Sequence, residues 1–261
     1  MVIRANLAAN ASDFDWRVNT SISAKTSGLA CNGIPLSDDA RLTVVVPVQL
    51  TKKKKLTLPI PNATALCLDR AHSAFSHANA LRKKANIDTT LKSDVSFPFT
   101  SDAMDFFALR MEAVVLAVIA IEAFVNESIP DGYSFVSKHE RTDHTLTRPK
   151  SEIERYVTLD EKLATVLPGA LARCPTPKGM AAWQKYLLLR KLRDRLVHLK
   201  TEDRKAIWPE LASVWTDLVL CLDPALSAKS IIDHFVPYLP KRPDWHRLYP
   251  YGRCLRQHRD D

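Results

Sequence analysis

The stretch Leu187–Lys200, LLLRKLRDRLVHLK, decides the expected fold and carries the most informative side chains. Its apolar positions recur every three or four residues, which is typical of a helix with one buried face. Inside it Arg193, Asp194 and His198 form the pattern R-D-x-x-x-H. Arginine can hold a phosphate group with a planar fork of donors, and histidine can move protons near neutral pH. The stretch therefore predicts a helix equipped for phosphate binding and for proton transfer.

The geometry of a straight helix limits how these side chains can work together. Asp194 and His198 are four residues apart and share a face, so the carboxylate can fix the imidazole ring and its tautomer. Arg193 and His198 are five residues apart and point about 140° away from each other. A site that uses both therefore needs a bent helix end or a second copy of the helix.

A second long helix is predicted over residues 101–128, with Ser101 or Asp102 as its cap. Its centre is apolar nearly all round, which indicates a helix packed on several sides. Glu122 and Asn126 interrupt this surface on one face. They form either a polar edge of the helix or a supporting pair that approaches and positions the helix of Arg193 and His198.

These two segments resemble a known superfamily. The segment Arg193–His198, RDRLVH, resembles the R-x4-H motif of the HEPN superfamily, and Ala120–Ile129, AIEAFVNESI, is similar to the first long bundle helix of many such proteins. The resemblance covers roughly residues 100–240 and implies a mainly α fold, an antiparallel helical bundle. It also implies a metal-independent endoribonuclease without a cofactor, with a site shared by two protomers.

The chemistry of RNA cleavage suits these side chains. RNA carries its own nucleophile, the 2′-hydroxyl beside the phosphate, so a protein need only move protons and stabilise the extra negative charge. The resemblance implies that Arg193 binds the phosphate, that His198 acts as general base or acid, and that Asp194 orients one of them. The expected products are a 2′,3′-cyclic phosphate and a 5′-hydroxyl.

The resemblance further suggests a toxin or phage-defence effector that acts as a homodimer through the motif helix, with an antitoxin or regulatory protein as a further partner. Two other interpretations stay open. Lys191, Arg193 and Arg195 could form an exposed basic stripe, with His198 an ordinary helix residue. Alternatively, the chain is a non-catalytic helical dimerisation module that binds RNA or a protein partner.

The charge of the chain is uneven. The net charge is +8, and residues 1–100 carry 13 basic and 7 acidic residues, a surplus of six. A basic surface favours polyanions such as RNA through counterion release, although a basic protein without such a partner fits equally well. Arg195 is a second candidate for contact with RNA, on the motif helix itself.

A small hairpin is predicted before the bundle. Arg41–Leu50 and Lys55–Ile60 are rich in β-branched residues and leucine, and the run TKKKK at 51–55 separates them. Pro47 and Pro59 argue for edge strands. The lysines of the run are either a solvated loop that discourages edge pairing or a contact for nucleic acid. They are Lys52, Lys53, Lys54 and Lys55.

Three regions follow from these patterns. Residues 1–99 form an extension with the hairpin and one helix at Asn62–Asn86, residues 100–240 form the HEPN-like bundle, and residues 241–261 form a basic and aromatic tail. The tail either wraps over its own domain or stacks on bases. Within the bundle, residues 131–150 are expected to form a loop, and Ser151-x-x-Glu154 resembles a capping box that starts a helix reaching about Leu167.

Cysteine and membrane signals point to the cytoplasm. The five cysteines are widely spaced, form no C-x-x-C pair and are odd in number, as expected for thiols in a reducing compartment. The amino terminus lacks the apolar run of a signal peptide, and no apolar stretch reaches the roughly 20 residues that span a bilayer. No metal site is expected, because His72 and His77 have no third ligand nearby.

Overall fold

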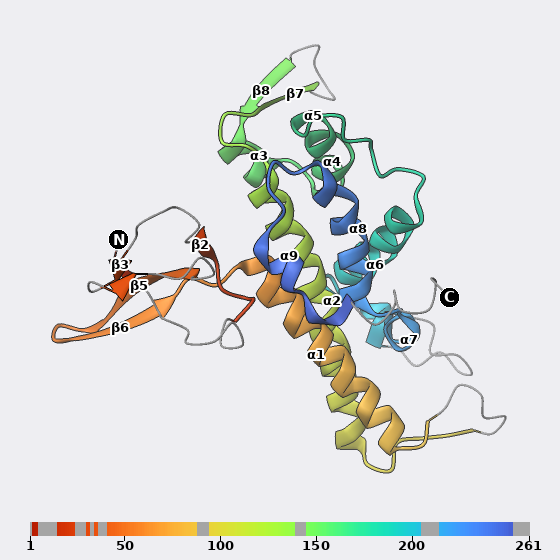
Figure 1. The fold of residues 1–261 in the computed structure, drawn as a ribbon. Helices are drawn as coiled ribbons and strands as arrows, with labels where there is room; N and C mark the ends of the chain where they lie inside the picture. The colour runs from red at the N-terminus through yellow and green to blue at the C-terminus, as the bar shows by residue number, and fades with distance from the viewer. Residues whose placement is uncertain are drawn as a thin grey trace, which may run out of the picture. The chain divides into compact units, whose positions relative to one another are not determined.

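The computed structural model describes residues 2–4, 15–23, 30–31, 34–35, 41–87, 94–138, 145–204 and 214–252 of the chain (Figure 1). The chain divides into two compact units. The first combines Met1–Leu66 with Lys241–Asp261, and the second is Cys67–Pro240. The predicted mainly α fold with a small antiparallel hairpin is confirmed for the described residues.

The first unit is built around the predicted hairpin. Its strands are β5 (Arg41–Thr51) and β6 (Lys54–Pro59), which pair antiparallel. Lys52 and Lys53 form the turn, and all four lysines from 52 to 55 are exposed. The amino-terminal unit therefore presents its lysine run as a solvated tip.

Two further strands pair with the first half of β5. β1 (Val2–Arg4) and β2 (Thr20–Ser23) lie antiparallel to residues 41–45. The prediction that β5 is an edge strand is therefore wrong for this half. Pro47 lies in the second half, opposite Thr57 of β6, which is the one partner strand described there. Because no second strand of the described residues pairs at this position, no ladder there needs the N–H that the proline lacks.

The carboxyl-terminal residues pack on this same unit. Three short elements complete it: β3 (Ala30–Cys31), β4 (Ile34–Pro35) and α9 (Asp244–Leu248). The indole of Trp16 meets the rings of Tyr249 and Tyr251 edge-on, with ring centroids 5.4 and 6.4 Å apart. Of the two interpretations of the tail, the structure therefore favours packing over its own chain, as far as Tyr251.

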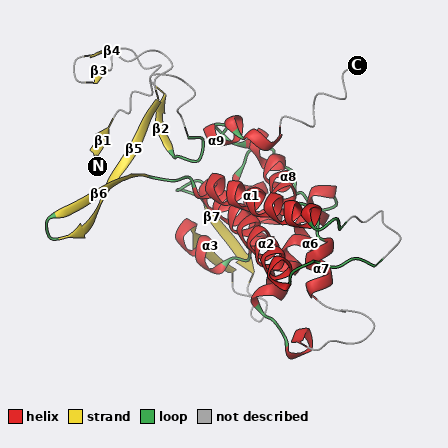
Figure 2. Cartoon of the chain, turned by 90° about the horizontal axis from the view of Figure 1, so that it is seen from below, coloured by secondary structure: helices red, strands yellow, loops and turns green. Residues whose placement is uncertain are grey.

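Helices make up most of the second unit (Figure 2). The longest described ones are α1 (Ala63–Lys84), α2 (Thr100–Ser128), α6 (Ala181–Val197) and α8 (Pro224–Phe235). α2 packs against α6, α8 and the shorter α7 (Val214–Leu220). Its buried side chains cover one broad face of the helix, whereas Ile119 on the opposite face is 44% exposed, so the prediction that its centre is packed on nearly all sides is wrong. The predicted cap is wrong, because Phe99 is the N-cap and its side chain makes no capping hydrogen bond.

Contacts along α2 show the direction of its neighbours. Arg70 near the start of α1 pairs with Glu112 at 2.6 Å, and Lys84 at its end lies 3.6 Å from Asp102. α1 therefore runs antiparallel to α2. Near the start of α2, the ring of Phe107 packs on Trp215, whose indole N–H donates to the backbone carbonyl of Asp203 beyond the end of α6. The end of α6 therefore lies at the beginning of α2, so these helices are also antiparallel.

The segment between α2 and α6 differs most from expectation. The predicted loop at 131–150 is instead a hairpin of β7 (Ser134–Lys138) and β8 (Thr145–Pro149), with residues 139–144 outside the described part. The expected capping box is absent, because the N-cap is Pro149 and makes no side-chain hydrogen bond. The helix expected to reach Leu167 is divided into four short pieces: α3 (Lys150–Tyr156), α4 (Leu159–Glu161), a π-helical turn (Lys162–Val166) and α5 (Leu167–Ala170).

The boundaries of the units also differ from expectation. Residues 67–99 belong with the helical unit rather than with the amino-terminal extension. Their helix, α1, packs along α2, where the guanidinium of Arg110 lies 4.2 Å from the ring centroid of Phe75. The spacing of apolar residues predicts such a helix, but it cannot show which other helix packs against its buried face.

Candidate functional site

The motif helix ends earlier than its sequence suggests. α6 stops at Val197, and His198 is its C-cap with φ −117° and ψ 57°. The backbone N–H of His198 donates to the carbonyl of Asp194 at 3.0 Å, which closes the last turn. The imidazole is exposed and leaves the chain after the helix has ended. The imidazole is therefore attached to the C-cap residue at the helix end rather than to a regular helical position.

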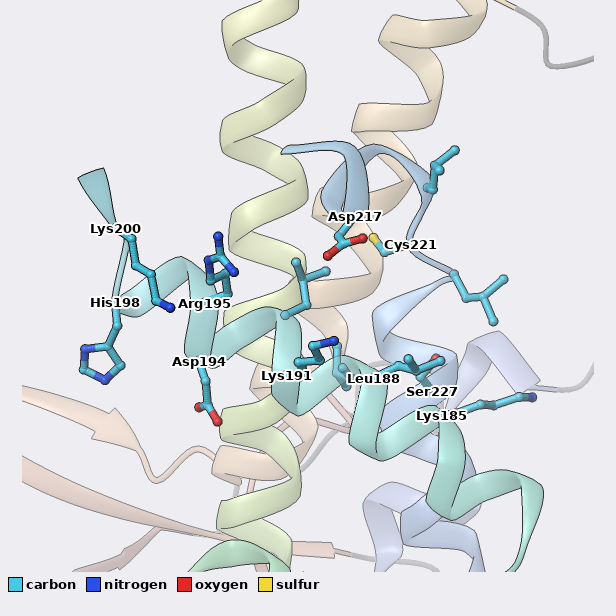
Figure 3. A pocket seen from close by; sticks show the side chains of 14 residues that line it. Lys185, Leu188, Lys191, Asp194, Arg195, His198, Lys200, Asp217, Cys221 and Ser227 are labelled. Carbon is cyan, nitrogen blue, oxygen red and sulfur yellow. The ribbon is translucent and has the colours of Figure 1, made fainter. Parts of the chain in front are cut away.

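The expected contact between Asp194 and the imidazole is not formed. The carboxylate of Asp194 pairs instead with Nη1 of Arg193 at 3.1 Å. Since His198 lies at the C-cap, the four-residue spacing no longer brings the two side chains together, and Figure 3 shows them apart from each other. Asp194 thus restrains the arginine of the motif rather than its histidine.

A pocket of about 510 Å³ runs along α6 toward α7 and the start of α8 (Figure 3). His198, Asp194 and Arg195 line it, whereas Arg193 does not. One chain therefore does not bring the two main motif residues to the same cavity. The other lining residues are Lys185, Leu188, Leu189, Lys191, Leu192, Lys200, Asp217, Leu220, Cys221, Leu222 and Ser227.

The pocket combines positive charge with exposed apolar surface. Lys185, Lys191 and Lys200 line it together with Arg195, against the carboxylates of Asp194 and Asp217. Three lining leucines are largely exposed: Leu188 at 65%, Leu220 at 69% and Leu222 at 65%. A charged pocket rimmed by exposed leucines is typical of a surface that meets a partner.

An ion pair fixes the end of the motif helix. Arg195 donates to both carboxylate oxygens of the buried Asp203, at 2.6 and 3.1 Å, and the backbone N–H of Lys200 donates to the same group at 2.8 Å. The hydrogen bond from Arg195 is the main cause that holds the pKa of Asp203 below its ordinary value. Arg195 therefore has an internal partner, which reduces the charge that it can offer to RNA.

We expect Asp203→Asn to lower the melting temperature, because the amide cannot accept both donors of Arg195. The folded pKa of Asp203 is lowered, so the unfolded chain binds the proton more readily. The carboxylate therefore contributes stability above about pH 4, its unfolded pKa, and this is lost as pH falls through the folded pKa. Thermal melts at pH 7 and pH 3 test this, with Asp217→Asn, at an exposed position of α7, as the control. A similar loss in both variants would contradict the prediction.

The motif helix also carries a partly buried cluster that the sequence did not reveal. The hydroxyl of Tyr186 donates to Asp160, and Arg190 pairs with the other oxygen of the same carboxylate. Burial is the main cause that raises the pKa of Tyr186, and the positive charge of Arg193 acts in the opposite direction. Nε of Arg193 is buried and has no hydrogen-bond partner within the described chain. Arg193 thus stands at the edge of this cluster.

The predicted supporting pair serves a different residue. Lys162 is 1% exposed at its side chain, and its Nζ donates to Asn126 at 2.9 Å and to the carbonyl of Glu154 at 2.8 Å. Glu122 lies 3.8 Å from the same ammonium. Glu122 and Asn126 therefore hold the π-helical turn of Lys162, and the prediction that they position the motif helix directly is wrong. Burial lowers the pKa of Lys162.

Because a buried ammonium depends on its acceptors, we expect Asn126→Ala to destabilise the fold by about 1–3 kcal/mol. Lys162→Met should cost less, since a flexible apolar side chain removes the charge and fills the same space. Urea unfolding of the two variants at pH 7 measures the difference. Asn126→Ala as stable as the wild type would show that the amide is not needed by Lys162.

No known protein family, curated protein or solved structure matches this chain. Within its described part, no three His, Cys, Asp or Glu side chains gather where they could hold a metal ion. No described helix is long and apolar enough to pass through a membrane. The fold and site thus define a mainly helical protein with a basic pocket at the end of its motif helix.

Proposed function

We propose that the protein is a metal-independent endoribonuclease of the HEPN type. The observation that carries the proposal is the position of His198, exposed at the end of α6 on the wall of a pocket rich in lysine. There an imidazole can reach a bound phosphodiester, and nearby ammonium groups can attract one. The antiparallel packing of α6 on α2 is compatible with the bundle that the R-x4-H resemblance implies.

The proposed reaction uses the 2′-hydroxyl of RNA as its nucleophile. His198 accepts the hydroxyl proton or donates a proton to the leaving 5′-oxygen, depending on its protonation state. Arg193 stabilises the negative charge that builds on the phosphorus oxygens. Asp194 keeps the guanidinium in place through its 3.1 Å contact with Nη1. The P–O5′ bond breaks as the 2′-oxygen bonds to phosphorus, which leaves a 2′,3′-cyclic phosphate and a 5′-hydroxyl.

The active form is a homodimer that meets through the motif helix. Within one chain Arg193 does not line the pocket of His198, so a complete site needs Arg193 of a second copy. The exposed leucines at 188, 220 and 222 offer the apolar surface for such a contact. A symmetric interface would bring each arginine to the histidine of the other copy and form two sites.

Mixing two inactive variants tests the shared site. Arg193→Ala and His198→Ala homodimers should each be inactive, while a mixed dimer keeps one intact site. After unfolding and refolding together in equal amounts, cleavage should return to about a quarter of the wild-type rate. Recovery of no activity, with mixed dimers shown by mass spectrometry, would contradict the shared site.

The hairpin tip is a proposed contact for the RNA backbone. Lys52, Lys53, Lys54 and Lys55 are exposed. Replacing all four with glutamine should weaken RNA binding at low salt. The slope of log affinity against log salt concentration should fall by about 0.7 for each phosphate of a single strand that the lysines no longer neutralise. An unchanged slope would show that these lysines do not contact the RNA backbone and that the tip is only a solvated loop. A matched control replaces the exposed Lys84 and Lys178, which line neither described pocket.

In the cell, we infer a cytoplasmic toxin or phage-defence effector under the control of an antitoxin or regulatory protein. Expression of the wild type and of His198→Ala in bacteria tests this, with growth and RNA integrity followed together. The wild type should arrest growth and degrade RNA, and the variant should do neither. Intact RNA with the wild type expressed and folded would favour the alternative, a non-catalytic dimerisation module that binds RNA or a protein partner.

A further inference from the structure

A second cavity contains a buried positive charge that the proposed nuclease does not use. Arg110 of α2 is 1% exposed, although its guanidinium is charged at any ordinary pH. Nη2 donates to Oδ1 of Asn79 at 3.1 Å, and Nη1 donates to the carbonyl of Cys221 at 3.3 Å. Nε is buried and has no hydrogen-bond partner in the described residues.

The groups in direct contact with Arg110 do not neutralise it. Its described hydrogen-bond acceptors are neutral groups, and the rings of Phe75 and Phe106 lie 4.2 and 5.1 Å from its guanidinium carbon. No carboxylate of the described residues forms an ion pair with it. Burial lowers the pKa of Arg110, which reflects the cost of desolvating the charge. Buried charges in proteins are normally paired, whereas the compensating carboxylate among the described residues, Asp223, acts on Arg110 through its charge without forming an ion pair.

The cavity next to Arg110 has the size and charge to receive one. It measures about 820 Å³ and lies between α1, α2 and the turn from α7 to α8. Arg82 and Lys83 line it with Arg110, against a single lining carboxylate, Asp223. That carboxylate already caps α8 by accepting from the N–H of Leu226 at 3.0 Å. Three cations against one anion leave a surplus of two positive charges.

The rest of the lining suits an organic ligand. Asn79 and Asn86 supply amide groups beside the cations. Ile87, Val219 and Leu222 supply apolar wall on the same cavity. A small molecule with a phosphate at one end and a less polar body would satisfy both parts of the cavity.

We propose that this cavity binds a phosphate group, either free or carried by a small molecule, with Arg110 at its base and Arg82 and Lys83 at its side. A phosphate monoester carries up to two negative charges near neutral pH, which balances the surplus of the lining. Arg82 can donate two parallel hydrogen bonds to such a group, and the buried guanidinium of Arg110 adds its positive charge from behind the wall of the cavity. Neither Arg193 nor His198 lines this cavity, although it shares Leu220, Cys221 and Leu222 with the pocket of His198.

Thermal denaturation of the full chain tests the site, with inorganic phosphate, a nucleoside monophosphate and chloride compared at equal ionic strength. Phosphate-bearing ligands should raise the melting temperature in a saturable way, and chloride should not. A larger effect of the nucleotide would identify an organic phosphate as ligand, and equal effects would identify free phosphate. Stabilisation by an RNA oligonucleotide alone would overturn the proposal.

Single substitutions distinguish phosphate binding in the cavity from a general effect of positive surface charge. Arg82→Gln and Lys83→Gln should each weaken phosphate binding by about tenfold, as expected when a charge-assisted hydrogen bond is removed. Lys84→Gln is the matched control, because Lys84 neighbours Lys83 but pairs with Asp102 and does not line the cavity. Equal weakening in Lys83→Gln and Lys84→Gln would overturn the assignment.

Two further variants test the counter-ion itself. Arg110→Met should abolish the phosphate-dependent stabilisation while leaving the protein folded without phosphate, since it removes an unpaired buried charge. Asp88 lies outside the described residues. If Asp88→Asn destabilised the chain and the wild type showed no response to phosphate, the chain would supply its own counter-charge and the proposal would fail. If Arg110→Met does not fold, the comparison of Arg82→Gln, Lys83→Gln and Lys84→Gln decides.

Discussion

His198→Ala is expected to reduce RNA cleavage by about 10²–10⁴-fold, the usual contribution of a group that transfers protons in the rate-limiting step. The imidazole is exposed at the end of α6, so its removal leaves no cavity in the core. Stability should therefore change by no more than about 0.5 kcal/mol. Cleavage of a fluorescent RNA under single-turnover conditions measures the effect, with urea unfolding of the same samples.

The matched control for this substitution is His77→Ala. His77 is also exposed, but it lies on α1 and lines neither cavity. It should cleave RNA at the wild-type rate. If the His198→Ala protein cleaves RNA as fast as the wild type, the imidazole takes no part in the mechanism, whatever the control shows.

Arg193→Ala is expected to reduce activity by a comparable amount, because the phosphate would lose its guanidinium donors in the transition state. Arg193→Lys should restore only part of it, since an ammonium lacks the planar fork that binds two oxygens. Asp194→Asn should do less damage than either, because its amide oxygen still accepts a hydrogen bond from Arg193. Rates measured on one RNA at saturating concentration rank the three variants.

The control for the arginine is Arg155→Ala, on α3 and outside both cavities. Arg193 is partly buried at the edge of the cluster of Tyr186 and Asp160, so unfolding of each variant must be measured beside its rate. Full activity in Arg193→Lys would show that charge alone is needed. Full activity in Arg193→Ala, with the fold intact, would show that the arginine has no part in cleavage.

Sequence patterns predicted the elements whose formation depends on neighbouring residues. The leucine spacing that marks the motif helix reflects a buried face, and Leu189, Leu192 and Leu196 are buried. The β-branched run before TKKKK also forms its strand. The piecewise path through Lys162 was not predictable in this way. It depends on an acceptor in α2 that lies 36 residues earlier in the chain.

In the candidate site, too, the sequence predicted the features that depend on neighbouring residues and missed those that depend on distant contacts. The residue types of the motif could be read from the sequence, but their relative placement could not, because α6 ends at Val197 without a glycine or proline to signal it. The ion pair between Arg195 and Asp203 joins residues on either side of the turn that follows α6, and it therefore fixes the end of this helix. Tyr186 is a buried residue of the motif helix, and its hydroxyl contact with Asp160 is a tertiary feature that helical spacing cannot show.

The most direct test of the account is the chemistry of the cut RNA ends. Purified wild-type protein should cleave RNA in excess chelator and leave 2′,3′-cyclic phosphate and 5′-hydroxyl ends, which mass spectrometry distinguishes from other ends. The same RNA with a single 2′-deoxy residue at the cleaved position should resist cutting there, because its nucleophile is missing. Cleavage that requires a divalent metal, or that proceeds at the 2′-deoxy position, would contradict the proposed mechanism.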